Sequence, residues 1–550
     1  MSKQIKYGDE LRAKMFAGIE TVAKTVVLTM GPKGRNVVLD KGYGAPQVTN
    51  DGVTIAREIE LEDKFENMGA ELVKEAASKT NDIAGDGTTT ATLLTYGLAK
   101  EGLREIRTGI NAIELKNGMK KAGNEVIKEL SKNSKEITTT QEIAQVASLS
   151  AQDSEVGEII AKAMEKVGND GVITVEDGQT FGLELEVTEG MEFDQGYISP
   201  YMITSGEKML AEFRDAQILI TDIKISSMKD LLPLLEQSLG EGRKDLVIIA
   251  EDIDGEALTT IILNKLKGVL NILGIKAPGF GDKKKEMLKD IAILTGANVI
   301  TSELGMKLEN ATLDDLGHAK NVISEKGKTT IIGGAGDKSE INTRVGELKS
   351  AIENTDSKYD KEKLAERLAK LAGGVAVIKV GAASEVEMKE KKLRIEDALN
   401  ATRAAVEEGV VAGGGVALLK ASKVLENIDF GNTDQNIGAR IVKNSLSYPV
   451  KQIVENAGKE SSVITNEILK NTDINYGYDA SNDTYVDMIS AGIIDPKKVE
   501  RVALEEAISL AGMFLTTESG VVEIPKKESS CSGACQSGGG MGGMGMPGMY

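Results

Sequence analysis

The side chains with the most specific chemistry lie in a glycine-rich stretch, Asn81-Asp-Ile-Ala-Gly-Asp-Gly-Thr-Thr-Thr-Ala-Thr92. Gly85 and Gly87 flank Asp86, and glycine permits positive φ and a close approach of backbone to a ligand. Thr88 to Thr90 would then offer N–H and hydroxyl groups at the positive end of a helix. Such a turn can hold phosphate, and Asp86 can hold Mg²⁺ against it. The alternative is a plain turn whose threonines cap a helix, because the P-loop spacing is absent.

Two other acidic residues stand in comparable surroundings. Asp51 belongs to Thr49-Asn-Asp-Gly-Val53, and Asp397 lies in a predicted helix rich in Lys, Glu and Ala. Gly413-Gly-Gly415 offers another point where backbone could approach a ligand. With Asp86, these acids would suit a site for Mg-nucleotide and water, in which one carboxylate holds metal and another orients the nucleophile. The sequence alone does not show that they meet.

Helices must position these turns. Apolar residues recur at helical spacing before the glycine-rich stretch, and the pattern resumes after it. Residues 1–133 are predicted to be mostly helical, as is most of 409–525. The apolar positions are Phe65, Met68, Leu72, Ala76 and Ile83, and one short strand is expected at Arg35-Asn-Val-Val-Leu39.

The segment between these helical regions has an α/β pattern. A buried strand, a helix and a second buried strand predict a βαβ unit with parallel pairing, and a further strand and a charged helix follow. These elements are expected at 246–250, 255–267, 270–275, 375–380 and 385–408. The order is that of one domain inserted into another. Glycines stand at the two points where the chain passes between the helical and the α/β segments. They are Gly190 and Gly373-Gly374, and they are either hinges or ordinary strand-end residues.

Composition and charge exclude several classes of function. The 550-residue chain has a net charge of −19, and its basic residues form no patch, so we expect no nucleic-acid partner. Cys531 and Cys535 both lie in the tail, so we expect no disulfide in the folded body and too few ligands for zinc. The only histidine, His318, is expected at the surface, which argues against Ser-His-Asp and Cys-His catalysis.

The pattern of apolar residues leads us to expect a location in the cytoplasm. The first residues lack an apolar signal core, and no run of about 18 apolar residues occurs, so we expect a cytoplasmic protein with no membrane partner. Residues 526–550 lack any periodicity that could bury a core, and are predicted to form a flexible Gly/Met-rich tail.

Two predicted helices of the α/β segment carry more apolar side chains than one buried face needs. Either the surplus forms an exposed groove for protein partners, or both helices are deeply buried. The residues concerned are Lys229-Asp-Leu-Leu-Pro-Leu-Leu-Glu-Gln-Ser-Leu239 on one segment, and Leu258, Ile261, Ile262, Leu263 and Leu266 on the other.

Five long blocks, in order along the chain, resemble the group I chaperonins of the bacterial GroEL type. They are Leu28-Thr-Met-Gly-Pro-Lys-Gly-Arg-Asn-Val-Val-Leu-Asp40, Glu58-Ile-Glu-Leu-Glu-Asp-Lys-Phe-Glu-Asn-Met-Gly69, Ala84-Gly-Asp-Gly-Thr-Thr-Thr-Ala-Thr92, Lys276-Ala-Pro-Gly-Phe-Gly281 and Ala401-Thr-Arg-Ala-Ala-Val-Glu-Glu-Gly-Val-Val-Ala-Gly-Gly-Gly415. The Gly-Gly-Met tail is similar to that family too, so the likeness runs from about residue 5 to the C-terminus.

The resemblance implies a multi-domain α and α/β fold. It implies a largely helical, ATP-binding equatorial domain (1–133 and 409–525), a small intermediate hinge domain (134–189 and 375–408) and an inserted α/β apical domain (190–374). Such subunits form stacked seven-membered rings, capture unfolded or partly folded proteins, and enclose them with a GroES-like co-chaperonin. The implied activity is an ATPase coupled to protein folding, with ATP, Mg²⁺ and K⁺ as cofactors.

The resemblance also implies roles for individual residues. Asp86 matches the Mg²⁺ ligand, and Asp397 matches the carboxylate that positions or activates the attacking water, with Asp51 as a second acid. Thr29, Asn50 and Thr89 would supply backbone or side-chain oxygens to K⁺. The implied nucleotide contacts are Thr29, Met30, Gly31, Pro32, Gly87, Thr88, Thr89, Thr90, Gly414, the base loop Asp479, Ala480 and Ser481, and Asp495 at the ribose. The implied apolar groove is Tyr197, Tyr201, Met202, Leu232, Leu235, Leu258, Ile262 and Leu263.

The chain departs from the family pattern at four places. Thr-Lys-Asp-Gly is usual where Thr49-Asn50-Asp51-Gly52 stands, and Tyr-Asn-Ala-Ala is usual where Tyr478-Asp479-Ala480-Ser481 stands. Met30 and Met202 replace a usual Leu and Phe. Hydrogen bonding to the base can therefore differ. Asn50 either acts through its carbonyl, which every residue has, or lacks a lysine charge that is usual there.

Two other functions fit part of the pattern. A small-molecule kinase or synthetase would need the Mg-nucleotide site, but neither the apolar helices nor a ring. A passive holding protein would need the groove but not Asp397. ATP turnover without a phosphoryl acceptor, together with the native mass, distinguishes the three.

Overall fold

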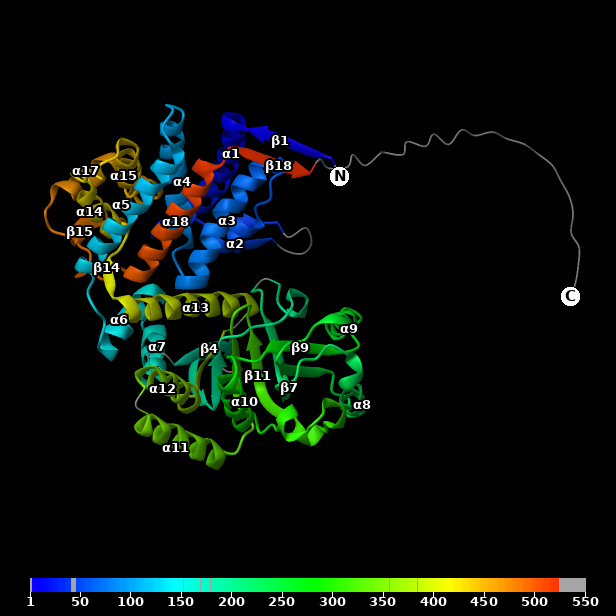
Figure 1. Cartoon of the computed structure of the whole chain (residues 1–550). Helices are drawn as coiled ribbons and strands as arrows, with labels where there is room; N and C mark the ends of the chain where they lie inside the picture. Colours follow the sequence, from blue (N-terminus) through cyan, green and yellow to red (C-terminus); the bar gives the residue numbers. More distant parts are fainter. Residues whose placement is uncertain are drawn as a thin grey trace, which may run out of the picture.

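A computed structural model describes residues 2–523 except 41–45, 152, 169–170, 179–180, 207, 356 and 383. The predicted tail over 526–550, with Cys531 and Cys535, lies outside the described residues. Figure 1 shows a helical body above, and below it a middle layer that lies beside a sheet-containing region. Within the described ranges, no helix is long and apolar enough to cross a membrane.

The two halves of the helical body come from opposite ends of the chain. α18 (Lys497–Thr516) contacts α3 (Lys64–Ala84), α4 (Thr88–Ile106) and α5 (Ala112–Asn133), and lies among them in Figure 1. Leu504 and Phe514 of α18 are fully buried in this shared core. The C-terminal helix therefore completes a core that the N-terminal helices cannot close alone.

Local signals set the helix boundaries in this body. Asp63 caps α3 by accepting hydrogen bonds from the N–H groups of Phe65 and Glu66, and Gly85 ends the helix in the left-handed conformation. The remaining helices are α1 (Gly8–Val26), α2 (Gly52–Glu58), α14 (Val416–Ala421), α15 (Thr433–Ser445), α16 (Tyr448–Asn456) and α17 (Ser461–Lys470), with 3₁₀ turns η1 (Val27–Thr29) and η7 (Ser422–Leu425).

Four two-stranded sheets border the body. β1 (Lys3–Tyr7) pairs antiparallel with β18 (Ser519–Glu523), and β2 (Val37–Leu39) pairs with β3 (Gln47–Thr49). The other two pairs are β14 (Val410–Ala412) with β17 (Ile494–Pro496) and β15 (Tyr476–Asp479) with β16 (Thr484–Asp487). The strand predicted at 35–39 corresponds to β2, which begins only at Val37 and is therefore shorter than expected.

The middle layer contains a three-stranded sheet in the order β4-β13-β5. Its central strand β13 pairs in parallel with β4 and antiparallel with β5, so the two passages of the chain between regions are joined in one sheet. A Cβ on Gly190 would lie 2.4 Å from the Ile331 carbonyl oxygen, and Gly374 has a φ of +66°. A close contact at Gly190 and a positive φ at Gly374 therefore account for these two glycines. A hinge role stays a prediction. The elements are α6 (Thr140–Ala151), α7 (Ser154–Val167), β4 (Val172–Asp177), β5 (Gly182–Thr188), β13 (Val375–Gly381) and α13 (Glu385–Glu408).

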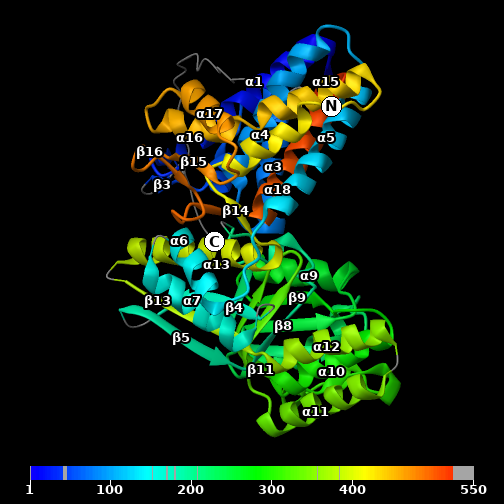
Figure 2. The same ribbon diagram turned by 90° about the vertical axis from the view of Figure 1, so that its left-hand side faces the viewer.

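Helix α13 lies between the helical body and the sheet region in both views (Figures 1 and 2). Its bounds, Glu385–Glu408, match the predicted helix 385–408, and Ser384 caps its start by accepting from the Glu387 N–H. This helix carries Asp397, so its position decides where that carboxylate lies.

The lowest region is built on a mixed sheet in the order β6-β12-β11-β7-β8-β9, with β10 beside β7. β8 and β9 are parallel and α9 connects them, which confirms the predicted βαβ unit. The strands are β6 (Gly190–Phe193), β7 (Ala211–Thr221), β8 (Asp245–Ala250), β9 (Asn271–Lys276), β10 (Val299–Ile300), β11 (Gly317–Ser324) and β12 (Thr329–Gly334). The helices and 3₁₀ turns are α8 (Leu232–Gly240), α9 (Gly255–Leu266), α10 (Asp282–Thr295), α11 (Lys338–Asn354), α12 (Lys358–Ala372), η2 (Pro200–Met202), η3 (Met228–Asp230), η4 (Ser302–Leu304), η5 (Leu308–Asn310) and η6 (Leu313–Asp315).

His318 is less exposed than predicted. It lies inside β11, paired with Gln217 of β7, and its side chain is half-buried. A strand in the middle of the sheet turns alternate side chains into the covering layers, which the polar sequence around His318 did not indicate.

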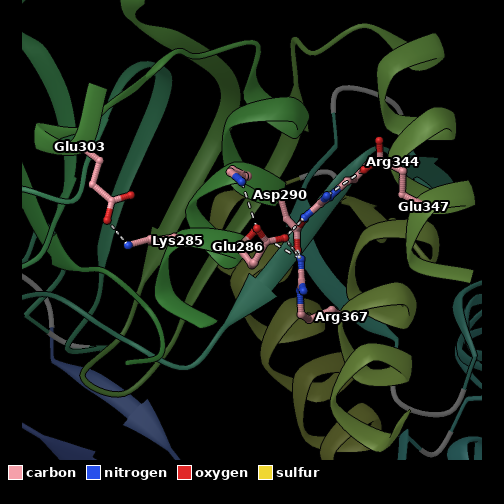
Figure 3. Close-up of polar contacts among 8 residues, drawn as sticks. Lys285, Glu286, Asp290, Glu303, Arg344, Glu347 and Arg367 are labelled. Carbon is pink, nitrogen blue, oxygen red and sulfur yellow. Dashed lines mark hydrogen bonds and ion pairs between the residues drawn. The ribbon is translucent and has the colours of Figure 1, made fainter. Parts of the chain in front are cut away.

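A buried carboxylate joins the helices that cover this sheet (Figure 3). Asp290 of α10 receives a 2.8 Å hydrogen bond from Nε of Arg344 on α11 and another of 2.8 Å from Nε of Arg367 on α12. Glu286, one turn earlier, also binds Arg344 at 2.5 Å. Although burial opposes ionisation, hydrogen bonds from Arg344 and Lys289 lower the pKa of Glu286 to about 2. The carboxylates of α10 thus attach α11 and α12 to it through ion pairs.

We expect Asp290→Asn to lower the free energy of unfolding by about 2–3 kcal/mol, because two half-buried guanidinium groups lose their one fully buried carboxylate partner and keep only more exposed ones. Urea or thermal unfolding of the variant measures this loss. The matched control is Glu303→Gln, which removes an exposed ion pair with Lys285 and should change stability by less than about 0.5 kcal/mol. Equal losses in both variants would contradict a special role for the buried pair.

Candidate functional site

The glycine-rich turn joins α3 to α4 in the predicted conformation. Gly85 and Gly87 have φ values of 72° and 83°. Gly87 caps α4, and among the described residues no side chain forms that cap. Thr88 to Thr90 are therefore the first three residues of the helix, where N–H groups lack a partner within the helix. This geometry disfavours the alternative in which the threonines only cap the helix.

The start of a second helix meets this one. A Cβ on Gly52 would lie 2.5 Å from Oγ1 of Thr89 and 2.9 Å from Oγ1 of Thr88, so only glycine fits there. Asp51 caps α2: its Oδ1 accepts from the Val53 N–H at 3.2 Å and its Oδ2 from the Thr54 N–H at 2.9 Å. The N-termini of α2 and α4 thus converge. Asp51 already caps the start of α2, whereas the start of α4 has no side-chain cap and favours an anion.

Asp397 joins the same site from α13. Asn400, one turn later on that helix, packs on the turn so closely that a Cβ on Gly85 would lie 2.5 Å from the Asn400 Cβ. Loss of solvation, followed by the negative charges of Asp86 and Asp51, raises the pKa of Asp397 to about 7. The structure therefore brings together three acids that are far apart in the sequence.

Asp86 lies at the centre of this group. Its pKa is raised mainly by desolvation and also by the charge of Asp51, while a hydrogen bond from the Gly87 N–H opposes the rise. Both Asp86 and Asp397 are exposed to solvent, although neighbouring protein groups desolvate their carboxylates in part. A ligand can therefore reach both carboxylates.

The residues predicted for the nucleoside lie on the other side of Asp86. Gly414 and Gly415 have φ values of 65° and 75°. Their backbone N–H groups are close enough to Asp495 to oppose the rise in its pKa, which desolvation causes first. Strand β14 before the turn pairs with β17, which opposes Val411 and Asp495. The charge of Asp86 contributes to a raised pKa of Asp495. This turn, Asp495 and Asp86 therefore form one continuous site.

The predicted base loop packs on the Gly414 turn. A Cβ on Gly414 would lie 3.3 Å from the Met488 methyl, and Met488 belongs to the same hydrophobic cluster as Ala480. Asp479 accepts a 2.8 Å hydrogen bond from the Ser481 N–H and another of 2.8 Å from Nδ2 of Asn482. The carboxylate of Asp479, which departs from the family pattern, thus accepts hydrogen bonds within its own loop.

The loop after α1 forms a further border of the site. Nδ2 of Asn456 donates to the carbonyl oxygens of Val27 and Met30, at 2.9 Å each, and Gly31 has a φ of 83°. Thr29 donates its hydroxyl to the Val26 carbonyl at 2.8 Å, and η1 contacts α4. The exposed residues here are Gly31 and Pro32, with Asn50 exposed after β3 and Ser481 exposed in the base loop.

The donor set suits Mg²⁺ that arrives with phosphate. Within the described ranges, no group of three or more His, Cys, Asp or Glu side chains is arranged to hold a metal alone. Mg²⁺ commonly uses one or two carboxylates, with waters and phosphate oxygens as its other ligands. The exposed carboxylate of Asp86 beside two helix N-termini fits that pattern.

The predicted apolar groove is only partly exposed. Tyr197, Met202 and Leu235 are 8%, 0% and 2% exposed, so the structure places them in the core and corrects that part of the prediction. Tyr201, Leu232 and Leu263 are 66%, 49% and 50% exposed, Leu266 is 70% exposed, and Leu258 and Ile262 are half-buried. We call the last six residues the apolar surface. It lies on η2, α8 and α9, and both helices contact η3.

An ion pair connects this region to α13. Nζ of Lys208, which follows η2, lies 2.9 Å from both carboxylate oxygens of Glu396, the neighbour of Asp397. The positive charge of Lys208 also opposes the rise in the Asp397 pKa.

Sequence reasoning missed one residue of the site, Glu500. It lies in the first turn of α18, where an acidic residue ordinarily complements the helix dipole, so the sequence carries no signal that it is buried.

A model of the TCP-1/cpn60 chaperonin family matches residues 22–525 of the chain. The match includes the glycine-rich turn, all the acids described above and the apolar surface.

Proposed function

The chain belongs to the TCP-1/cpn60 chaperonin family, and from that premise we propose that it is an ATP-driven chaperonin of the group I, GroEL type. The coarser function, assistance to protein folding, comes with the family. The observation that supports ATP dependence is the meeting of Asp51, Asp86 and Asp397 at the N-termini of two helices. We propose that the helical body, middle layer and sheet region are the equatorial, intermediate and apical domains with the boundaries predicted from the sequence.

In the proposed site, the N–H groups of Thr88, Thr89 and Thr90 bind the phosphates. Mg²⁺ bound to Asp86 would neutralise phosphate charge. Carbonyl or hydroxyl oxygens of Thr29, Asn50 and Thr89 would face K⁺. The exposed side chain of Asn50 and the intact Asp51 cap favour the reading in which the Asn50 carbonyl is the ligand.

Asp397 is the proposed catalytic base. It faces Asp86 and Asp51 from α13, where it can accept a proton from the attacking water or orient it. Asp495 and Gly414 would hold the ribose, and the loop with Asp479, Ala480 and Ser481 would lie at the base.

The apolar surface is the proposed binding site for unfolded proteins and for a GroES-like co-chaperonin. Exposed Tyr201, Leu232, Leu263 and Leu266 offer side chains that a hydrophobic segment can cover. For ring assembly we propose the open edges of the β1–β18 and β2–β3 pairs, which expose Tyr7, Val38, Val48 and Val521. The cytoplasmic location stays a prediction.

One experiment separates this function from the alternatives. Purified protein is assayed for ATP turnover without any phosphoryl acceptor, and the particles are imaged by electron microscopy with ATP and co-chaperonin. A chaperonin hydrolyses ATP and forms rings. A kinase or synthetase needs an acceptor, and a passive holding protein prevents aggregation without turnover.

The raised pKa of Asp397 predicts a pH dependence. Below a pH of about 7 its carboxyl is protonated and cannot accept a proton, so kcat/KM should rise with pH through about 7. The positive charge of Mg²⁺ near Asp86 favours the ionised form, so the corresponding rise in kcat should occur at lower pH. Steady-state ATPase between pH 5 and 9 measures both profiles. Asp397→Asn is the control, because its residual rate should lack this step. A wild-type kcat/KM that is flat across pH 7 would contradict the assignment.

A further inference from the structure

Glu500 is a buried acid without an obvious counter-charge. It is 4% exposed, and its Oε2 is fully buried and accepts no hydrogen bond from any donor in the described part of the chain. An ionised carboxylate in this position would carry charge on an oxygen that neither water nor protein solvates, which is costly. The structure therefore favours Glu500 as a neutral carboxylic acid.

The charged groups around Glu500 support this state. Asp495 of β17 forms a side-chain hydrogen bond with it, and Asp86 acts on it through negative charge. The nearby cations of α18 are engaged elsewhere: Lys497 lies 3.4 Å from Glu408, Lys498 2.5 Å from Glu407, and Arg501 2.6 Å from Glu408 and 2.8 Å from Glu505.

A hydrogen bond between two carboxyl groups requires a proton, and the burial of the two residues indicates which holds it. Glu500 is enclosed, whereas Asp495 is half-buried, and the backbone N–H groups of Gly414 and Gly415 favour its ionised form. Burial and then the charge of Asp495 raise the pKa of Glu500 well above its ordinary value. The acid is therefore Glu500, and Asp495 is the carboxylate that accepts from it.

The free capacity of Asp495 defines what it can bind. A carboxylate has about four lone-pair positions, and the hydrogen bond with Glu500 occupies one of them. Acceptor positions remain on a side chain that solvent can reach. They suit a hydroxyl donor and not a second anion.

Building on the proposed nucleotide site, we propose that Glu500 is a positioning residue: as a carboxylic acid it donates a hydrogen bond to Asp495 and thereby orients the free acceptor positions of Asp495 toward one ribose hydroxyl of the nucleotide. Glu500 is 4% exposed, so its own side chain is not offered to a ligand.

The test compares ATP with 2′,3′-dideoxyATP, which carries the same triphosphate but no ribose hydroxyl. Affinities with Mg²⁺ are measured by titration calorimetry for the wild type, Glu500→Gln and Glu500→Leu, after thermal unfolding and native mass have been recorded. The amide of Glu500→Gln can still donate to Asp495, whereas Glu500→Leu cannot.

We expect the wild type to prefer ATP by about tenfold, the effect of one hydrogen bond to a charged group. Glu500→Leu should lose about tenfold in ATP affinity and nothing in dideoxyATP affinity, and Glu500→Gln should keep the preference. At alkaline pH the wild type should lose its preference as the shared proton leaves and the two carboxylates repel, while Glu500→Gln should not.

Three results would overturn the inference. They are an unchanged preference in Glu500→Leu, a loss in Glu500→Gln as large as that in Glu500→Leu, or the same alkaline loss in wild type and Glu500→Gln. If Glu500→Leu fails to fold, Glu500→Gln and the pH series still decide. A wild type that binds neither nucleotide would instead refute the proposed function, whereas equal binding of both by all three proteins refutes only the role of Glu500.

Discussion

Asp397→Ala is expected to lower ATP hydrolysis by a factor of about 10² or more while ATP affinity stays nearly unchanged. In the proposed mechanism, the carboxylate acts on the water and not on the bound nucleotide. Docking of α13 should persist, because Asn400 and not Asp397 packs on the Gly85 turn. Asp51 is a poor substitute, since its carboxylate already accepts from the N–H groups of Val53 and Thr54. Single-turnover hydrolysis and nucleotide titration measure the two quantities separately.

The matched control for this variant is Glu396→Gln. Glu396 is the neighbouring acid on α13, but it pairs with Lys208 at the surface, and exposed pairs contribute less than about 1 kcal/mol. Its hydrolysis rate should change by no more than about threefold. If Asp397→Ala weakened binding as much as turnover, Asp397 would be a ligand contact and not the base.

Tyr201→Glu is expected to abolish capture of unfolded protein while basal ATPase survives. A charge in the centre of an apolar surface must be desolvated by any hydrophobic client, and Tyr201 lies in the sheet region, away from the nucleotide site. Suppression of aggregation of a denatured enzyme measures capture. Binding of a co-chaperonin loop should fail together with capture, because both are proposed to use this surface.

Two further variants sharpen this test. Val463→Glu introduces the same charge on an exposed apolar position of α17 in the helical body, and should leave capture intact. Leu235→Glu is unsuitable as a probe of binding, because Leu235 is 2% exposed and the change would destabilise the sheet region. If Tyr201→Glu still prevented aggregation, the apolar surface would not be the capture site.

Local patterns predicted the elements of this fold well. The helix expected at 385–408 is α13, the expected break at the Gly85 turn ends α3, and the strands around α9 form the expected parallel pair. Each of these signals acts within a few residues. Ile83 is an exception: it follows the apolar repeat of α3 but is exposed near the end of the helix.

The division of apolar residues on α8 was predicted less well, although its basis is local. Leu231, Leu234, Leu235 and Ser238 are buried and follow the spacing of one helical face, which leaves Leu232 and Leu239 outside. Counting apolar residues without assigning faces placed Leu235 in the groove. Met202 was misplaced for another reason, because its burial depends on packing against β9, where its Sδ lies 3.3 Å from the Gly274 nitrogen.

The meeting of the acids could not be read from the sequence at all. Asp51, Asp86, Asp397 and Asp495 come from four segments, and only the packing of α13, α18 and β17 against the glycine turns brings them together. Glu500 was missed because burial of a charge leaves no trace in composition or spacing.

The central strand β13 ends at Gly381 and the chain enters α13 at Glu385, only a few residues later. Since β4 and β5 hold both edges of β13, this sheet cannot turn without carrying the base of α13 with it. A rotation of this sheet would therefore displace Asp397 relative to Asp86. In the proposed function, such a rotation would couple protein binding in the sheet region to the rate of ATP hydrolysis, because the base would reach the water only at one orientation of the sheet.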